Sequence, residues 1–182
     1  MALLGWGVVT GEASYPLRAL TATVTKEKGW GTFNWSGYSN AKADALLDQA
    51  LAAVDNAKRE KLLQQATQVV IQDYAIILMD IDGTILTWNA GAEKIKGYKE
   101  HEILGQNFRL FYMPQDRQSG LPEQLIDLAV KEGRARHIGR RLRKDGTIFW
   151  GSILITALHD DDGEVIGFTK LTREIGDNER IL

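Results

Sequence analysis

The sequence contains no cysteine among its 182 residues. Disulfides, thiolate nucleophiles and cysteine-ligated metals are therefore excluded. No apolar run approaches the roughly 18 residues that a membrane-spanning helix requires. The N-terminus also lacks the basic segment that opens a signal peptide. We therefore expect a cytoplasmic protein with no membrane partner.

Charge of neither sign dominates, since the formal net charge is −2, and this gives no general reason to expect nucleic acid as a partner. Six basic residues nevertheless lie close together: Arg134, Arg136, Arg140, Arg141, Arg143 and Lys144. No aromatic stacking platform accompanies them, as a site for single-stranded nucleic acid would require. We predict that they form the exposed side of a strand and its turn, facing the acidic residues 160–162 or Glu174.

The most informative stretch runs from Ala75 to Tyr98. Residues 76–80 and 84–88 are apolar enough for two short strands, and Asp82-Gly83 between them is typical of a hairpin turn, because glycine supplies the positive φ that a tight turn needs. Asn89 is a good N-cap for a following helix, because its side-chain oxygen can accept a free backbone N–H.

This stretch resembles the entry to a PAS domain, the sensor module common in bacterial signalling proteins. Four later segments resemble PAS motifs in the same order: 97–106, 111–117, 143–150 and 161–175. Several segments in the right order are far more specific than a single motif. The resemblance covers residues 75–175, so we predict a PAS domain over residues 75–182.

The first part of the chain has a different character. From Ser39 the apolar residues Leu46, Leu47, Ala50, Leu51 and Val54 fall on one helical face. Asp55-Asn56 then interrupts the pattern, and a second amphipathic helix follows with Leu62, Leu63, Ala66, Val69 and Val70. So short a connection predicts an antiparallel helical hairpin.

Residues 1–74 resemble the C-terminal end of the periplasmic peptide-binding proteins of ABC transporters. The similar segments are 3–8, 33–35, 38–40, 43–47 and 57–59. The simplest interpretation is a chimera with its seam near Tyr74. Because a peptide clamp needs both lobes of that family, the resemblance does not carry peptide binding over, and a vestigial peptide-binding module is an alternative.

A catalytic alternative rests on residues 76–84, which fit the signature of haloacid-dehalogenase-type phosphatases. In that family the aspartates corresponding to Asp80 and Asp82 are nucleophile and general acid/base beside Mg²⁺. The lysine that the scheme needs after Thr156 is missing. The scheme also needs a parallel sheet, whereas the turn at Asp82 reads as a hairpin. We therefore expect no enzyme and no metal site.

Two cofactors of the PAS family can be judged from single positions. Residues 105–110 resemble the segment of LOV photosensors that carries the flavin-reactive cysteine, and Phe108 stands at that position. Haem-binding members carry a histidine on the helix that follows the segment corresponding to residues 111–117. Residues 118–125 of this chain contain no histidine. His137 and His159 are better explained as surface or hydrogen-bonded residues. We therefore expect neither covalent flavin chemistry nor haem, and the cofactor is unknown.

The PAS resemblance implies an α+β fold with a five-stranded antiparallel sheet in the order 2-1-5-4-3. Short helices between about residues 90 and 132 are expected on one face. The strands at 147–158 and 164–172 are apolar on both sides, which implies that the second face is covered too. The helical hairpin at 39–74 or a second subunit is the available cover.

The resemblance implies a sensory and regulatory module for signal transduction that binds a small ligand or forms a homodimer. The chain stops at Leu182, so we expect no effector domain of its own. Six apolar residues are pocket candidates from their apolarity and the PAS topology: Ile95, Phe108, Phe111, Leu125, Ile138 and Leu154.

Overall fold

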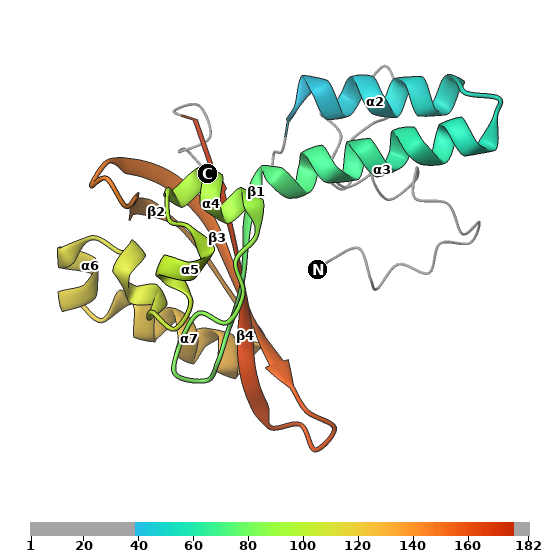
Figure 1. Cartoon of the computed structure of the whole chain (residues 1–182). Helices are drawn as coiled ribbons and strands as arrows, with labels where there is room; N and C mark the ends of the chain where they lie inside the picture. The colour runs from blue at the N-terminus through green and yellow to red at the C-terminus, as the bar shows by residue number, and fades with distance from the viewer. Residues whose placement is uncertain (1–38, 177–182) are drawn as a thin grey trace. The chain divides into compact units, whose positions relative to one another are not determined.

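The computed structural model describes residues 39–176 (Figure 1). The chain divides into two compact units, the first ending at Ile71 and the second beginning at Gln72. Among the described helices, none is long and apolar enough to cross a membrane.

The first unit contains helices α2 (Ala41–Ala52) and α3 (Asn56–Gln72), as the sequence predicts. Asn40 caps α2 by accepting the N–H groups of Lys42 and Ala43, and Asp55 accepts the N–H of Lys58 at 2.7 Å. The two helices meet through four buried residues: Leu47, Ala50, Leu63 and Ala66.

The predicted apolar stripe on α2 is only partly buried. Leu51 is 42% exposed and Val54 is 94% exposed. Because α2 ends at Ala52, Val54 lies beyond the helix and does not continue its buried face.

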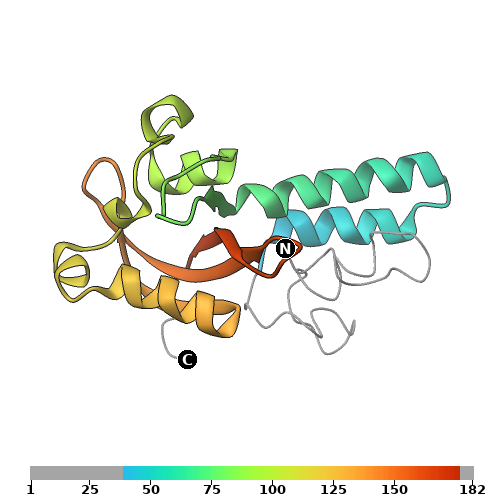
Figure 2. The same ribbon diagram turned by 90° about the horizontal axis from the view of Figure 1, so that it is seen from below.

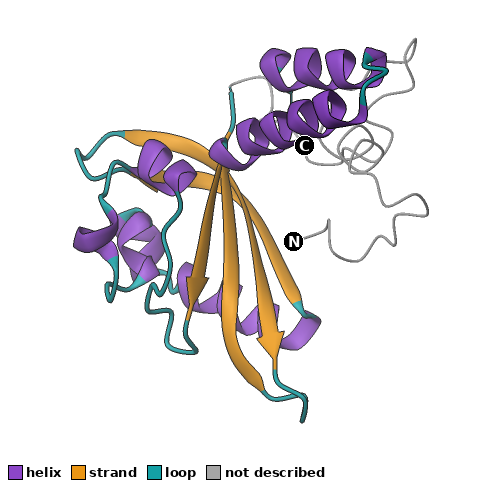
Figure 3. Cartoon of the chain, turned by 45° about the vertical axis from the view of Figure 1, so that its right-hand side comes forward, coloured by secondary structure: helices purple, strands orange, loops and turns teal. Residues whose placement is uncertain are grey.

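The second unit is built on an antiparallel sheet. Its strands are β1 (Tyr74–Met79), β2 (Arg134–Leu142), β3 (Ile148–His159) and β4 (Val165–Glu174). They lie in the order β1-β4-β3-β2 (Figure 3). The prediction of a fifth strand is therefore wrong for this structure, although the order of the other four agrees with it.

The segment predicted as that fifth strand, residues 84–88, divides its backbone hydrogen bonds between two neighbours. Leu86 donates to Leu78 of β1 at 2.8 Å, but Ile85 donates to Gln106 and accepts from Gly105. The N–H of Leu78 is taken by the hydroxyl of Thr87 instead of a backbone carbonyl. The ladder is thus reduced to isolated bridges such as Met79 with Ile85.

Five short helices follow this segment: α4 (Ala90–Lys96), α5 (Glu100–Ile103), the 3₁₀ helix η1 (Phe108–Phe111), α6 (Pro114–Gln118) and α7 (Leu121–Glu132). Figure 2 shows α4 and α7 beside the sheet. Both contribute to the core, α4 through Ile95 and α7 through Leu125 and Ala129.

The start of α4 is tied directly to β1 by Asn89. Its side-chain oxygen accepts the N–H of Ala92 at 2.9 Å and that of Ile76 at 3.0 Å. Its side-chain nitrogen donates to the carbonyl of Tyr74. The predicted N-cap is therefore confirmed, and it also holds helix and strand together.

Gly91 in α4 lies close to the backbone of Tyr74, the first residue of β1. A Cβ atom at this position would lie 2.1 Å from the carbonyl oxygen of Tyr74. We therefore predict that Gly91→Ala destabilises the second unit by about 1–3 kcal/mol, because the backbone must move to admit the methyl group. Chemical denaturation measures this change.

The control is Ala90→Ser, which adds one heavy atom at the exposed neighbouring position. Equal stability of the Gly91→Ala variant and the natural chain would show that the helix does not lie this close to the strand.

Candidate functional site

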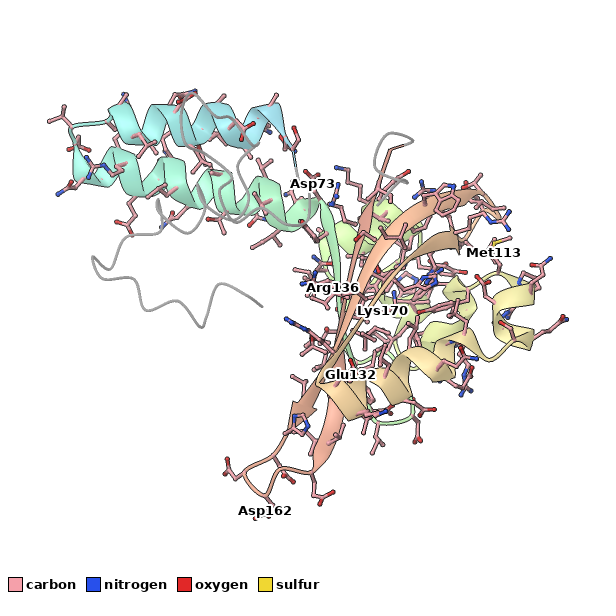
Figure 4. All side chains as sticks on the ribbon, turned by 180° about the vertical axis from the view of Figure 1, so that it is seen from behind. Asp73, Met113, Glu132, Arg136, Asp162 and Lys170 are labelled. Atoms are coloured by element: carbon pink, nitrogen blue, oxygen red, sulfur yellow. The ribbon has the colours of Figure 1, made fainter. Side chains whose placement is uncertain are left out.

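Three fully buried basic residues lie in the interior of the second unit. Lys96 comes from α4, Arg141 from β2 and Lys170, which Figure 4 labels, from β4; each of the three residues is 0% exposed. Lysine and arginine are almost never fully buried unless they are paired. Their partners therefore decide what this interior can do.

The sheet register places Lys170 in the middle of its inner face. It lies between Ile77 on β1 and Ile155 on β3, both of which are completely buried. The next inner position along β4 is Thr172, whose hydroxyl lies 2.8 Å from the Lys170 ammonium group.

A recess in the inner face makes room for Arg141. Gly139 on β2 and Gly151 on β3 are directly paired, so two neighbouring positions carry no side chain. A Cβ atom at Gly139 would lie 2.5 Å from the His137 ring and 3.1 Å from the Arg141 guanidinium. The glycine therefore allows His137 and Arg141 to meet, with Arg141 Nη2 3.1 Å from His137 Nδ1.

The three cations contact two aromatic rings, Phe111 in η1 and Tyr112 directly after it. Lys96 Nζ lies 4.1 Å from the Phe111 ring centre, and Lys170 Nζ lies 5.9 Å from the same point. The Arg141 guanidinium stacks 3.9 Å from the centre of the Tyr112 ring. Cation–π attraction at these distances partly compensates the loss of water.

Two cationic nitrogen atoms of this interior, Lys96 Nζ and Arg141 Nε, have no hydrogen-bond partner in the described part of the chain. No carboxylate forms an ion pair with any of the three cations among the described residues. A buried environment without a partner of opposite charge strongly disfavours the charged form of a side chain. We call Lys96, Arg141, Lys170, Tyr112 and Thr172 the cationic cluster.

The protonation equilibria reflect this shortage of negative charge. Burial, followed by repulsion from Arg141 and Arg143, lowers the pKa of Lys96 to about 7. Burial and repulsion from Lys96 and Arg141 lower the pKa of Lys170 well below its ordinary value.

The β2 side of the cluster titrates differently. Burial raises the pKa of Tyr112 and lowers that of His137. Asp116 acts electrostatically on Tyr112, His137 and Arg141, and Glu123 acts on Tyr112. Neither acid is among the groups that shift the two lysines.

The structure brings four of the six predicted pocket residues together. Ile95, Phe108, Phe111 and Leu125 all belong to the buried core between sheet and helices. Ile138 and Leu154 alternate with inward-facing residues on β2 and β3 and therefore lie on the opposite face of the sheet. Ile138 is 37% exposed.

A surface pocket of about 630 Å³ lies beside the cluster, lined by Lys94, Ile95, Gly97, Arg143, Lys144, Asp145 and Glu174. The Phe149 ring connects the two places. Its centre lies 4.4 Å from the Arg143 guanidinium, which borders the pocket, and 5.4 Å from Lys96 Nζ inside.

The basic run differs from its prediction at one residue. Arg134, Arg136 and Arg140 are exposed, and Arg143 is ion-paired with Glu174 at 2.7 Å, as expected for a solvated strand and turn. Arg141 is instead fully buried, because it shares the inner face with Ala135 and Gly139. Alternate residues of a strand share a face, so this spacing in the sequence indicates that Arg141 is buried. Lys170 has the same spacing, two residues from the buried Phe168 and from the buried Thr172.

The phosphatase interpretation does not fit the fold. The sheet is antiparallel throughout, and the Asp80 carboxylate serves a turn. It accepts the N–H of Asp82 at 3.0 Å and that of Thr84 at 2.7 Å. Between residues 39 and 176, no group of three or more His, Asp or Glu side chains is placed to hold a metal ion.

The PAS fold family model matches residues 57–175. This match spans more than half of the chain. The chain belongs to the PAS family.

Related proteins agree with this assignment. Two-component system protein A of Emericella nidulans is 45% identical over 105 residues, 58% of this chain and 15% of that protein. Phototropin-2 of Oryza sativa is 35% identical over 96 residues, 52% of this chain and 10% of that protein. The chain thus spans a small part of the curated relatives that it matches. The shared PAS module is sensory and belongs to signal transduction.

A different kind of relative bears on the N-terminal resemblance. Glutathione-binding protein GsiB of Pectobacterium atrosepticum is 30% identical over 96 residues, 52% of this chain and 17% of that protein.

Solved structures agree on the fold. The PAS domain from Colwellia psychrerythraea has a TM-score of 0.54 at 24% identity, over 62% of this chain and 97% of that one. The LOV domain of the blue-light photoreceptor Aureochrome1 has a TM-score of 0.51 at 23% identity, over 65% of this chain and 86% of that one.

The LOV likeness raises the question of flavin, and the interior does not fit a cysteine-adduct flavin. The chain has no cysteine. The Phe108 side chain, at the position expected for that cysteine, is 2% exposed and packs edge-on against Tyr112 with ring centres 5.7 Å apart. Phe111 is stacked on Trp88 at 5.8 Å. A buried aromatic ring thus stands where the flavin-reactive cysteine would be.

We predict that Lys96→Met stabilises the protein, because it removes a buried charge that has no partner. The folded-state pKa of about 7 lies below the ordinary 10.5, so the unfolded chain binds more protons between these values. The penalty is complete below pH 7 and fades as the pH rises toward 10.5. The gain should reach about 2–5 kcal/mol at pH 6, at about 1.4 kcal/mol per pKa unit.

Urea denaturation at pH 6 and pH 9.5 measures the effect. Lys94→Met, on the exposed side of the same helix, should change stability by no more than about 0.5 kcal/mol at either pH. A gain from Lys96→Met that is the same at both pH values would contradict the assigned cause.

Proposed function

We propose that the PAS unit is a sensor that binds a small molecule between its sheet and its helices. The observation that carries this proposal is that two buried cationic nitrogen atoms, Lys96 Nζ and Arg141 Nε, have no hydrogen-bond partner among the described residues. Native interiors satisfy nearly all such groups. A bound molecule that supplies the missing partners explains why they persist.

The connection from this site to the rest of the chain runs through β4 and β1. Lys170 and Thr172 lie on β4, and the next residue, Arg173, pairs with Tyr74 at the beginning of β1. Helix α3 ends one residue before that strand. A ligand that shifts β4 therefore acts directly on the junction with α3, which we propose as the route of the signal. The module senses and does not catalyse.

We also propose that the module forms a homodimer through the outer face of its sheet. Ile76, Leu171 and Leu154 are cross-strand neighbours on three adjacent strands and form an apolar row on this face. The helices α4 and α7 contribute their core residues to the inner face. Burying the outer apolar row against a second copy removes it from water.

The first unit has a candidate evolutionary origin in a peptide-binding protein. The support is the GsiB similarity together with the N-terminal motifs. We propose that residues 1–74 descend from such a protein, in a chain that acts in the cytoplasm.

Native mass spectrometry tests the ligand proposal. Protein purified without denaturation should carry an added small-molecule mass that disappears after unfolding. Refolded, ligand-free protein should melt at a lower temperature, because a ligand that binds only the folded state stabilises it. Equal native and denatured masses, with identical melting temperatures, would contradict ligand binding.

Leu154→Glu tests the dimer. We expect it to weaken self-association at least about tenfold, because a carboxylate would enter an apolar contact. Sedimentation velocity at several concentrations gives the change. Val130→Glu, an equivalent substitution on the exposed side of α7, should leave association unchanged. A natural chain that sediments as a monomer at every concentration would refute the proposed dimer.

A further inference from the structure

We propose that the ligand of the cationic cluster is a small organic anion that presents carboxylate or phosphate oxygens to Lys96, Lys170 and Arg141. This inference rests on the proposed sensor function and assigns the chemical class of its ligand.

The main argument is the contrast between surface and interior. Five exposed or half-buried cations of this unit have acidic partners: Lys94 with Asp73, Lys99 with Glu93, Arg109 with Glu123, Arg143 with Glu174 and Lys144 with Glu102. The three completely buried cations have none. Stability alone favours the reverse, since an isolated buried charge is far more costly than an exposed one. An anionic ligand supplies the missing negative charge.

The arrangement of donors matches such a ligand. Lys96 and Lys170 both lie within 6 Å of the Phe111 ring centre, and Lys170 also lies 6.0 Å from the Tyr112 ring centre, on which Arg141 stacks. Carboxylate and phosphate oxygens accept hydrogen bonds from ammonium and guanidinium groups, which are the strongest donors available to a protein. The Tyr112 and Thr172 hydroxyls add neutral donors at the same place.

The cationic cluster favours a ligand that carries more than one negative charge. In addition to burial, repulsion from Arg141 and Arg143 lowers the pKa of Lys96. Burial together with repulsion from Lys96 and Arg141 lowers the pKa of Lys170. Of the acidic groups nearby, Asp116 and Glu123 act on the Tyr112 and Arg141 side only. A dianion such as a dicarboxylate or a phosphate ester restores the charged form of both lysines, so its binding takes up protons near neutral pH.

Isothermal titration calorimetry on the ligand-free full chain tests the assignment. The probes are succinate, citrate and inorganic phosphate, with dimethyl succinate as the neutral analogue. Ionic strength is held constant with sodium chloride. Millimolar or lower concentrations avoid the general stabilisation that excluded salts produce. Repeating each titration in two buffers of different ionisation enthalpy measures the protons taken up.

We expect at least one of the three anions to bind, with proton uptake at pH 7.5, and dimethyl succinate not to bind. Lys170→Met and Arg141→Gln should weaken binding at least tenfold. Both variants remove a buried unpaired charge, so folding is not at risk, and circular dichroism checks this. Lys131→Met and Arg140→Gln remove the same charges from exposed positions outside the cluster and the surface pocket and should bind as the natural chain does.

Three outcomes would overturn the assignment: none of the anions binds, dimethyl succinate binds as tightly as succinate, or Lys170→Met leaves anion binding unchanged. If native mass spectrometry meanwhile reveals an uncharged ligand, the sensor function stands and the anionic class is wrong. Comparing succinate and citrate with inorganic phosphate distinguishes a carboxylate ligand from a phosphate ligand.

Discussion

The interior of the PAS unit depends on the contact between buried cations and the aromatic rings of Phe111 and Tyr112. Three positive side chains from three different elements converge there without a carboxylate. The rings provide attraction, but a quadrupole compensates only part of what a charge loses when it leaves water. The fold therefore holds a region whose polar groups are incompletely satisfied, and this distinguishes it from an ordinary hydrophobic core.

The remaining structure keeps this region in place. Asn89 joins the start of α4 to β1, so Lys96 at the other end of that short helix is held at a defined distance from the sheet. The paired glycines Gly139 and Gly151 open the recess that Arg141 occupies. Lys170 lies on β4, which forms hydrogen bonds with both β1 and β3. A small displacement of this central strand therefore affects both of its neighbours.

Local signals in the sequence predicted much of this fold. The Asp-Gly turn, the Asn89 cap and the motif order led to the PAS fold and to the right order of the four observed strands. The apolarity of residues 84–88 predicts a strand, but apolarity does not reveal which backbone groups are available for a ladder. Here the Thr87 hydroxyl takes a position in the ladder that a carbonyl would otherwise occupy. The candidate site was harder to predict. Apolarity identified Phe111 and its neighbours, whereas Lys96, Arg141 and Lys170 were missed because charge normally indicates the surface. Only their periodicity placed them inside, and it also shows that Ile138 and Leu154 belong to the other face.

The central claim is that the cationic cluster lacks negative charge until an anion binds. NMR titration of the lysine side-chain resonances of ligand-free protein tests this most directly, with Lys96→Met and Lys170→Met used for assignment. The account predicts that Lys96 titrates at about 7, that Lys170 titrates well below 10.5, and that both pKa values rise when an anion binds. Two lysines that titrate near 10.5 in the ligand-free protein would contradict it.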